Sequence, residues 1–250
     1  MRWKVLDGLM YFFYGTENTL LMPFPNPPPS KLAEFPDIFN LPRDNFMILQ
    51  ATEKYITENP EIENLFQVEE NDELFDYLHR TDRLVELKGA KLAKKKNLVS
   101  QFMRANPSYQ RRLITSDIYE DCFKFAEKWC EIKTCEHIGI THEKSAIRRA
   151  FNHFKDIGLE GIAIFANGSM IAFSVFSRQN PNTYIVHFEK ADRNIKGAAQ
   201  IINWETAKYL SDKCTFINRE QDLAIPGLRQ AKSSYDPDFL ISGKNLRLKI

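Results

Sequence analysis

The fold is decided by residues 186–237, which read VHFEKADRNIKGAAQIINWETAKYLSDKCTFINREQDLAIPGLRQAKSSYDP. An apolar run at Thr183–Phe188 leads into this stretch, a helical pattern spans Ala198–Leu210, and a second short run follows at Cys214–Asn218. A crossover helix between two strands makes them parallel neighbours in one sheet. The stretch therefore predicts an α/β (α+β) fold in which two parallel strands flank the crossover helix.

Ionisable side chains gather at the end of each predicted strand. They are His187, Glu189, Lys190, Asp192 and Arg193 for the first strand, and Arg219, Glu220 and Asp222 for the second. A Pro-Gly break follows, and after it come Arg229, Lys232 and Tyr235. In open α/β sheets, ligands bind at the carboxyl ends of the strands. We therefore expect these side chains to surround a common site.

The composition is that of an ordinary globular protein. The chain has 250 residues, 43% of them apolar and 27% charged, with a formal net charge of +1. A charge this small creates no global field, so contact with a polyanion requires a local basic patch. No apolar run approaches the roughly 18 residues of a membrane span, and Asp7 and Gly8 interrupt any signal sequence. We expect a cytoplasmic protein whose four cysteines are reduced thiols.

Two halves are predicted, residues 1–107 and 108–250, with the boundary at the Asn106-Pro107 break. The first half is predicted to contain strands at Trp3–Leu6, Met10–Tyr14 and Thr19–Met22, helices at Ser30–Glu34 and Asp44–Glu58, and a strand at Glu61–Val68. A short helix or turn-rich segment at Asn71–Leu78 and a helix at Lys88–Arg104 follow. Around the deciding stretch, the second half adds a strand at Arg111–Thr115, a helix capped by Ser116 or Asp117 that runs to about Lys133, a loop at Thr134–Thr141 and a helix at His142–Asp156. It also adds strands at Gly161–Phe165 and Met170–Phe176, a short helix near Leu228 and a strand near Phe239.

The helix predicted at Lys88–Arg104 carries the strongest basic patch of the chain. At about 100° per residue, Lys95 falls on the same face as the apolar Leu92 and Val99, and Lys91 lies at the edge of that face. An ammonium that faces inward must extend to solvent, pair with a carboxylate or bind a ligand. We treat Lys91 and Lys95 as candidate binding residues, with a solvated helix face as the alternative.

The absence of several common motifs weighs against nucleoside triphosphate, Rossmann and α/β-hydrolase sites. The chain has no GxxxxGK[ST], no GxGxxG after a strand and no GxSxG. We also predict no metal site, because the spacing of Cys135 and His137 is too short for a closed zinc site. The turn from Arg193 to Gly197 precedes a helix, so it either presents backbone N–H groups to an anion or is an ordinary strand–helix turn.

Three segments together resemble a known family: KLAKKKN at 91–97, HFEKADRNIKGAAQIIN at 187–203, and FINREQDLAIPGLRQAKSSYDP at 216–237. They are similar to the C-terminal domain of phosphatidylglycerol lysyltransferases, in a soluble stand-alone form. The resemblance covers most of the chain and is strongest over residues 84–237. It implies two tandem GNAT-like acyltransferase folds, related to Fem-type aminoacyltransferases, with the first abbreviated and the site in the second.

The resemblance also implies a chemistry and its residues. Membrane-attached members of the family transfer lysine or alanine from aminoacyl-tRNA to a lipid hydroxyl. The family's lysine near the C-terminus corresponds to Lys232, followed by Tyr235 and Pro237, and its acidic position corresponds to Glu189 or Asp192. The GNAT pyrophosphate loop, R/Q-x-x-G-x-G/A, is altered here because its glycine is displaced by one position, to Gly197.

These patterns give a mechanistic hypothesis for acyl or aminoacyl transfer to an amine or a hydroxyl. Candidate catalytic residues are His187, Glu189 and Asp192 as proton acceptors, and Arg219 and Lys232 as oxyanion stabilisers. Candidate substrate-binding residues are Lys91, Lys95, Arg193, Gly197, Glu220, Arg229 and Tyr235. The candidate donors are aminoacyl-tRNA and acyl-CoA, and the candidate acceptors are a small molecule and a lipid headgroup. An acyl-CoA-dependent N-acyltransferase and a non-catalytic protein that binds tRNA or another polyanion remain alternatives.

Overall fold

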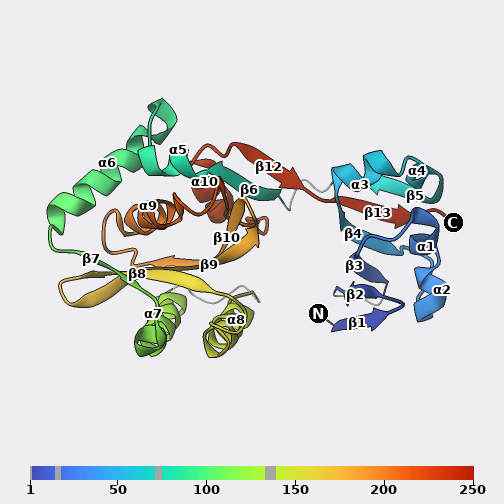
Figure 1. Ribbon diagram of the computed structural model, residues 1–250, viewed down its shortest axis with the longest axis horizontal. Helices are drawn as coiled ribbons and strands as arrows, with labels where there is room; N and C mark the ends of the chain where they lie inside the picture. The colour runs from blue at the N-terminus through green and yellow to red at the C-terminus, as the bar shows by residue number, and fades with distance from the viewer. Residues whose placement is uncertain (1, 15–17, 71–74, 133–138) are drawn as a thin grey trace. The chain divides into compact units, whose positions relative to one another are not determined.

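The computed structural model describes residues 2–14, 18–70, 75–132 and 139–250 (Figure 1). Its contacts divide the chain into two compact units. Unit 1 comprises residues 1–75, 222–224 and 241–250, and unit 2 comprises residues 76–221 and 225–240. The C-terminal strand thus returns to unit 1 after the chain has built unit 2.

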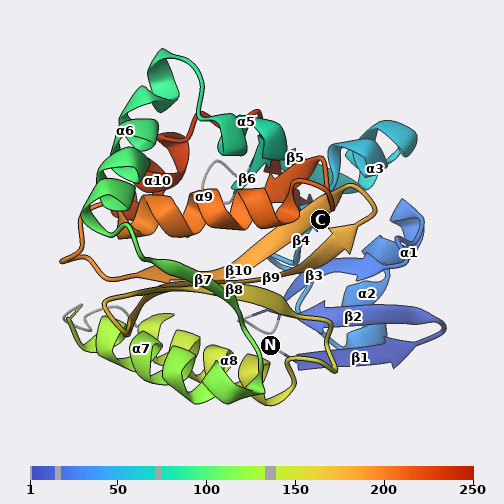
Figure 2. The same ribbon diagram turned by 60° about the vertical axis from the view of Figure 1, so that its left-hand side comes forward.

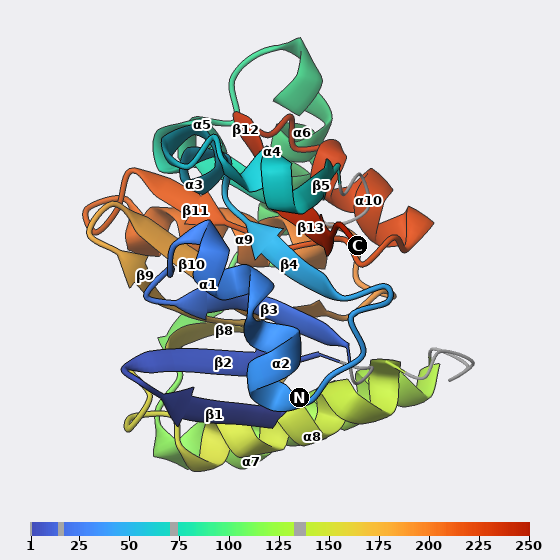
Figure 3. The same cartoon turned by 90° about the vertical axis from the view of Figure 1, so that its right-hand side faces the viewer.

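Unit 1 is a six-stranded mixed sheet with short helices. Its elements are β1 (Arg2–Leu6), β2 (Leu9–Phe13), β3 (Thr19–Phe24), α1 (Pro29–Ala33), α2 (Phe35–Phe39), β4 (Met47–Ala51), α3 (Glu53–Glu58), α4 (Ile62–Leu65), β5 (Phe66–Glu69) and β13 (Lys244–Leu248). The strand order is β1-β2-β3-β4-β13-β5, with β3 and β4 parallel. Helices α1 and α2 cover one face (Figure 3) and bury Leu32 and Phe35 against Tyr11 and Ile48 of the sheet.

Unit 2 contains a seven-stranded mixed sheet and the longer helices. Its elements are β6 (Phe75–Arg80), α5 (Thr81–Glu86), α6 (Ala90–Ala105), β7 (Gln110–Leu113), a 3₁₀ turn (Ser116–Ile118), α7 (Tyr119–Ile132), α8 (Gly139–Asn152), β8 (Glu160–Ala166), β9 (Ser169–Asn180), β10 (Thr183–Ala191), α9 (Ala198–Leu210), β11 (Phe216–Asn218), α10 (Pro226–Ser233) and β12 (Phe239–Ser242). The strand order is β12-β6-β11-β10-β9-β8-β7.

Helices cover both faces of the unit 2 sheet (Figure 2). Helix α9 buries Ile201 and Ile202 against one face together with Phe102 of α6, while α7 and α8 bury Phe123 and Phe151 against the other face. Parallel pairing of β10 with β11 across the crossover helix α9 is observed. The predicted fold class, with mixed sheets flanked by helices, is therefore confirmed.

Three local predictions in the N-terminal region are wrong in whole or in part. The segment Asp44–Glu58 is not one helix, because Met47–Ala51 forms strand β4 at the centre of a sheet and Thr52 then caps α3 by accepting a hydrogen bond from the Tyr55 amide at 3.1 Å. Glu61–Val68 is first a helical turn and becomes a strand only at Phe66. Phe75–Arg80 is strand β6, because it pairs with β11, so the described part of Asn71–Leu78 is neither the short helix nor the turn-rich segment predicted there.

The remaining elements agree more closely with the sequence pattern. Helix α9 has the predicted bounds, and α6, α7 and the strands β8, β9 and β10 differ from theirs by only a few residues. Strand β13 was not predicted. The loop predicted at Thr134–Thr141 lies mostly outside the described residues, as do the side chains of Cys130, Cys135, His137 and His142.

Candidate active site of unit 2

Two parallel strands separate where the candidate residues lie. Strands β10 and β11 pair from Thr183–Phe216 to Ile185–Asn218. Strand β11 then ends at Asn218, whereas β10 continues to Ala191 beside β9. The residue after β11 can therefore turn its side chain toward the continuing part of β10.

Glu189 and Arg219 form an ion pair across this separation. Arg219 donates from Nη2 to Glu189 Oε1 at 2.8 Å, and the two side chains are only 11% and 16% exposed. Asn203 on α9 donates from Nδ2 to the second carboxylate oxygen of Glu189 at 3.4 Å. The structure thus brings two of the predicted site residues into contact and adds Asn203. The only signal for Asn203 in the sequence is an amide among the apolar residues of a predicted helix.

Tyr235 lies against the same arginine. Its buried ring is 4.9 Å from the Arg219 guanidinium carbon and 4.4 Å from Lys95 Nζ, so two cations contact one aromatic ring. Burial and the charges of Arg219 and Lys94 lower the pKa of Lys95. Burial raises the pKa of Tyr235. We call Glu189, Arg219, Asn203, Tyr235 and Lys95 the Glu189–Arg219 cluster.

Polar atoms in and beside this cluster are buried without a partner. Among the described residues, neither Arg219 Nη1 nor Asn203 Oδ1 has a hydrogen bond, and the same holds for Nε2 of the neighbouring His79, whose ring packs edge-on against Tyr235. Burial and the charge of Arg219 lower the pKa of His79 to about 3, so its imidazole is neutral. A buried unsatisfied polar atom costs about 1–3 kcal/mol, and a bound ligand can supply the missing hydrogen bond.

Lys232 is engaged with the loop that follows β11. Its ammonium donates to the backbone carbonyl oxygens of Glu220 at 3.1 Å and Gln221 at 2.5 Å. It also lies 5.9 Å from the centre of the Tyr77 ring. In this arrangement Lys232 fixes the backbone next to Arg219.

His187 and Glu220 form a second polar group. His187 Nδ1 lies 3.0 Å from Glu220 Oε1, and His187 Nε2 lies 2.8 Å from Ser177 Oγ. Sequence reasoning missed Ser177, which is on β9 and becomes a neighbour of His187 only through the register of the β9–β10 hairpin.

The turn before α9 contains three further candidate residues, Asp192, Arg193 and Gly197. Asp192 accepts a hydrogen bond from the Asn194 amide at 2.9 Å, and Arg193 is exposed. Gly197 has φ +85°, and a Cβ there would lie 2.7 Å from the Leu98 carbonyl oxygen and 2.9 Å from Phe102 Cβ. The glycine thus allows the backbone of α6 to approach the first residue of α9.

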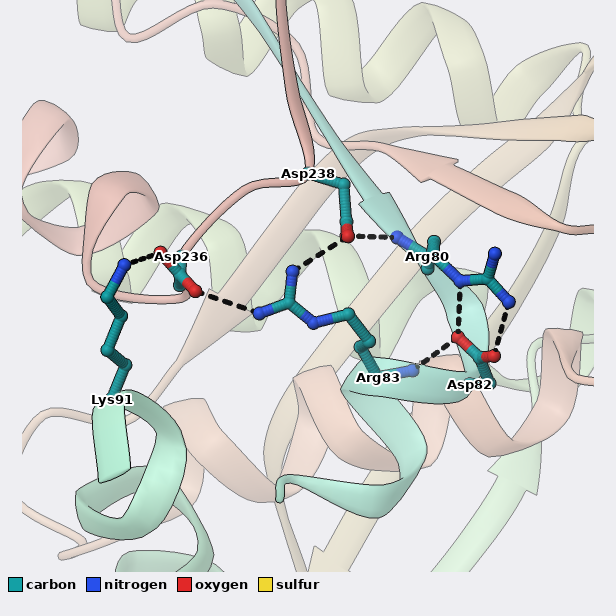
Figure 4. Close-up of polar contacts among 6 residues, drawn as sticks. All are labelled: Arg80, Asp82, Arg83, Lys91, Asp236 and Asp238. Atoms are coloured by element: carbon teal, nitrogen blue, oxygen red, sulfur yellow. Dashed lines mark hydrogen bonds and ion pairs between the residues drawn. The ribbon is translucent and has the colours of Figure 1, made fainter. Parts of the chain in front are cut away.

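A charge network fixes the loop that carries Tyr235 (Figure 4). Arg83 donates to Asp236 at 2.8 Å and to Asp238 at 2.7 Å, and Lys91 donates to Asp236 at 2.7 Å. Asp238 also accepts from the Arg80 amide at 2.7 Å. Lys91 therefore acts on the loop rather than lying beside Glu189, and Arg229 is exposed on α10.

The comparisons with known proteins agree with one another. The family model described as phosphatidylglycerol lysyltransferase, C-terminal, matches residues 8–242. The chain belongs to this family. A conserved protein of unknown function from Bacteroides thetaiotaomicron VPI-5482 is 31% identical with a TM-score of 0.88, over 99% of this chain and 85% of that one. The C-terminal domain of a putative lysylphosphatidylglycerol synthetase from Agrobacterium fabrum shares the fold at 11% identity, with a TM-score of 0.64 over 97% of this chain and 80% of that one.

An uncharacterized protein of Mycoplasmoides gallisepticum is 23% identical to this member of the phosphatidylglycerol lysyltransferase C-terminal family over 168 residues, which are 66% of this chain. The match spans 54% of that relative, so the chain corresponds to about half of its length. None of the helices in the described ranges combines the length and the apolar character needed to cross a membrane. Within those ranges, no group of three or more histidine, cysteine or acidic side chains could hold a metal ion.

Proposed function

We propose that unit 2 is an acyltransferase whose acyl group is an amino acid. The observation that carries this proposal is the Glu189–Arg219 cluster, where a buried ion pair adjoins Arg219 Nη1 and Asn203 Oδ1, two buried atoms with no hydrogen-bond partner in the described part of the chain. An aminoacyl ester offers a carbonyl oxygen, which accepts hydrogen bonds, and an α-ammonium group, which donates them. Judged from the residues that the structure describes, the cluster supplies one donor and one acceptor that are still without a partner.

The chemistry assigns a role to each group. Arg219 Nη1 donates to the carbonyl oxygen of the ester as negative charge develops on it. Glu189 accepts a proton from the attacking amine or hydroxyl, whose nitrogen or oxygen forms the new bond to the carbonyl carbon. The ester C–O bond then breaks, and its oxygen leaves with the proton. Lys232 keeps a supporting role, because its ammonium binds the backbone of residues 220 and 221.

Aminoacyl-tRNA is the donor that we favour over acyl-CoA. Family membership supports it, and Lys95 on α6 is a basic contact next to the cluster. Acyl-CoA requires a loop that offers free backbone N–H groups to its pyrophosphate. At Gly197 the Leu98 carbonyl oxygen, which is itself a hydrogen-bond acceptor, closely approaches the start of α9, and this disfavours an anion there. The acceptor is a small amine, a small alcohol or a lipid headgroup.

A donor screen tests this proposal. Purified protein is incubated with bulk aminoacyl-tRNA, uncharged tRNA, acetyl-CoA or a stable 3′-aminoacylamino-adenosine, and the melting temperature and transfer of radiolabelled lysine or alanine are measured. We expect the charged tRNA and the adenosine analogue to stabilise the protein, and Arg219→Met and Glu189→Gln to abolish transfer. Arg178→Met, which removes an exposed arginine on β9, is the matched control.

The other outcomes separate the alternatives. Stabilisation by acetyl-CoA alone indicates an acyl-CoA-dependent N-acyltransferase. Binding of uncharged tRNA as tightly as charged tRNA, with a steep salt dependence and no transfer, indicates a non-catalytic polyanion-binding protein. Either result would overturn the aminoacyl assignment.

A further inference from the structure

Ser177, His187 and Glu220 form a continuous hydrogen-bonded chain. Ser177 Oγ lies 2.8 Å from His187 Nε2, and His187 Nδ1 lies 3.0 Å from Glu220 Oε1. With a neutral imidazole protonated at Nδ1, the Nδ1–H group donates a hydrogen bond to the carboxylate of Glu220, and Nε2 accepts a hydrogen bond from the hydroxyl of Ser177. A nucleophile, a base and a group that orients the base are the three parts of an activated serine.

The hydrogen-bonded chain of Ser177, His187 and Glu220 lies on the opposite face of the sheet from the Glu189–Arg219 cluster. Side chains alternate along β9, so Ser177 shares the face of Val175, which packs in the core under α7 and α8. Glu189 instead contacts Asn203 on α9. The Ser177 chain is therefore a second site that does not depend on the proposed aminoacyl transfer.

Two irregular backbone conformations orient the side chains of His187 and Glu220. His187 lies at a register shift between Val186 and Phe188, and such bulges redirect a side chain out of the regular alternation. Glu220 has a left-handed backbone with φ +54°. That conformation costs free energy for a residue with a Cβ and occurs mostly where function or packing requires it.

Two neighbours hold Glu220 in this conformation. Its amide donates to Asn218 Oδ1 at 2.8 Å, and its carbonyl accepts from Lys232 Nζ at 3.1 Å. Both contacts are to the backbone, so the carboxylate remains directed to His187. The His187 and Glu220 side chains are 29% and 39% exposed, and Ser177 is partly exposed, so a small molecule can reach the chain.

We propose that Ser177 is an acyl-accepting nucleophile for small activated esters. Ser177 Oγ forms a bond to the acyl carbon while its proton moves to His187 Nε2. The bond to the leaving oxygen breaks, and that oxygen takes the proton from His187. Water then adds to the acyl carbon and gives a proton to His187, the Oγ–acyl bond breaks, and Oγ regains the proton. Glu220 is a positioning residue that holds the imidazole in the required tautomer.

Gln179 is a candidate for assisting this reaction. It lies two residues after Ser177 on β9, on the same face, and its Oε1 accepts from Asn218 Nδ2 at 3.3 Å. With Oε1 engaged, the NH₂ group is the end of this amide that can donate to the carbonyl oxygen of an ester. Such a donor would stabilise the oxyanion as it forms.

Covalent labelling provides the test. The full chain is treated with a fluorophosphonate probe, which loses fluoride as a serine oxygen bonds to phosphorus, and the modified residue is located by peptide mass spectrometry. We expect a label on Ser177, and a loss of labelling rate of roughly 100-fold or more in His187→Asn, as for removal of a general base. Ser169→Ala, at an exposed serine of the same strand, is the matched control and should label at the wild-type rate.

Turnover of p-nitrophenyl acetate separates chemistry from folding. Ser177→Ala should abolish the turnover, Ser177→Cys should retain a reactive thiol at this position, and Glu220→Gln should lower kcat with KM unchanged. Equal labelling of the wild type and Ser177→Ala would overturn the proposal, as would a label on other serines only. Because none of these variants alters Glu189 or Arg219, failure here would leave the donor screen unaffected, and the converse also holds.

Discussion

Arg219 and Glu189 are joined at 2.8 Å although one follows β11 and the other lies near the end of β10. The pair connects the two strands beyond the point where β11 ends and β10 continues. It also holds the positively charged guanidinium of Arg219 against Tyr235, with its central carbon 4.9 Å from the centre of the ring. One ion pair therefore serves both the packing of unit 2 and the chemistry proposed for it.

Removing one member of this pair should destabilise the protein strongly. Glu189→Leu leaves the Arg219 charge buried and unpaired, and we expect a loss of about 3 kcal/mol in the free energy of unfolding, measured by urea denaturation. The double variant Glu189→Leu/Arg219→Met should recover most of this loss, because it leaves no unpaired charge. A smaller loss is expected for Asp117→Ala, since the Arg112–Asp117 pair is exposed. Equal losses in the two single variants would contradict the burial argument.

Gly197 should tolerate a side chain poorly. Gly197→Ala combines a φ of +85° with two contacts below 3 Å, to Leu98 and Phe102 of α6, and we expect a loss of about 2–3 kcal/mol in unfolding free energy. Gly158→Ala is the control, because Gly158 has φ +67° and a methyl group there would meet nothing within 4 Å. It should cost only about 1 kcal/mol. If both variants lost the same unfolding free energy, the close approach of α6 would not be the reason for a glycine at position 197.

The sequence was sufficient for the part of the fold in which local pattern and tertiary role agree. Helix α9 has the predicted bounds, Ala198–Leu210, because buried apolar residues recur along it from Ala198 to Leu210. The parallel pairing of β10 and β11 follows from the crossover rule. These elements also place the ends of both strands at one edge, which is how Glu189 and Arg219 could be predicted together.

Other elements depend on long-range pairing that no local pattern contains. Residues 47–51 read as helix in their window, yet β4 lies between β3 and β13, and β13 is contributed by residues nearly 200 positions later. Strand β6 likewise becomes a strand by pairing with β11. Ser177 and Asn203 were missed for the same reason, since each is an ordinary polar residue until the register of β9 or the face of α9 is known.

The Asp238 carboxylate should contribute more to stability than the neighbouring lysine. It is 13% exposed and accepts hydrogen bonds from the Arg80 amide and the Arg83 guanidinium (Figure 4), so Asp238→Ala should lower the free energy of unfolding by about 2 kcal/mol. Lys91→Ala is the comparison, because Lys91 is 77% exposed and its ion pair should contribute little. Chemical denaturation of both variants tests the order. A larger loss of unfolding free energy in Lys91→Ala than in Asp238→Ala would show that Lys91 contributes more to stability than Asp238.

His79 should make the protein less stable in acid. Burial lowers its pKa to about 3 in the folded state, whereas a histidine in an unfolded chain has a pKa near 6.5. Between these values the unfolded state binds more protons, so the free energy of unfolding falls as the pH falls from about 6.5 toward 3. Between pH 7 and pH 4.5 this group should account for a loss of roughly 2–3 kcal/mol. His79→Phe should remove that part of the pH dependence, as read from urea midpoints at the two pH values. His153→Gln, at a histidine whose side chain is 64% exposed, should leave the dependence unchanged, and a wild-type slope in His79→Phe would show that other groups cause it.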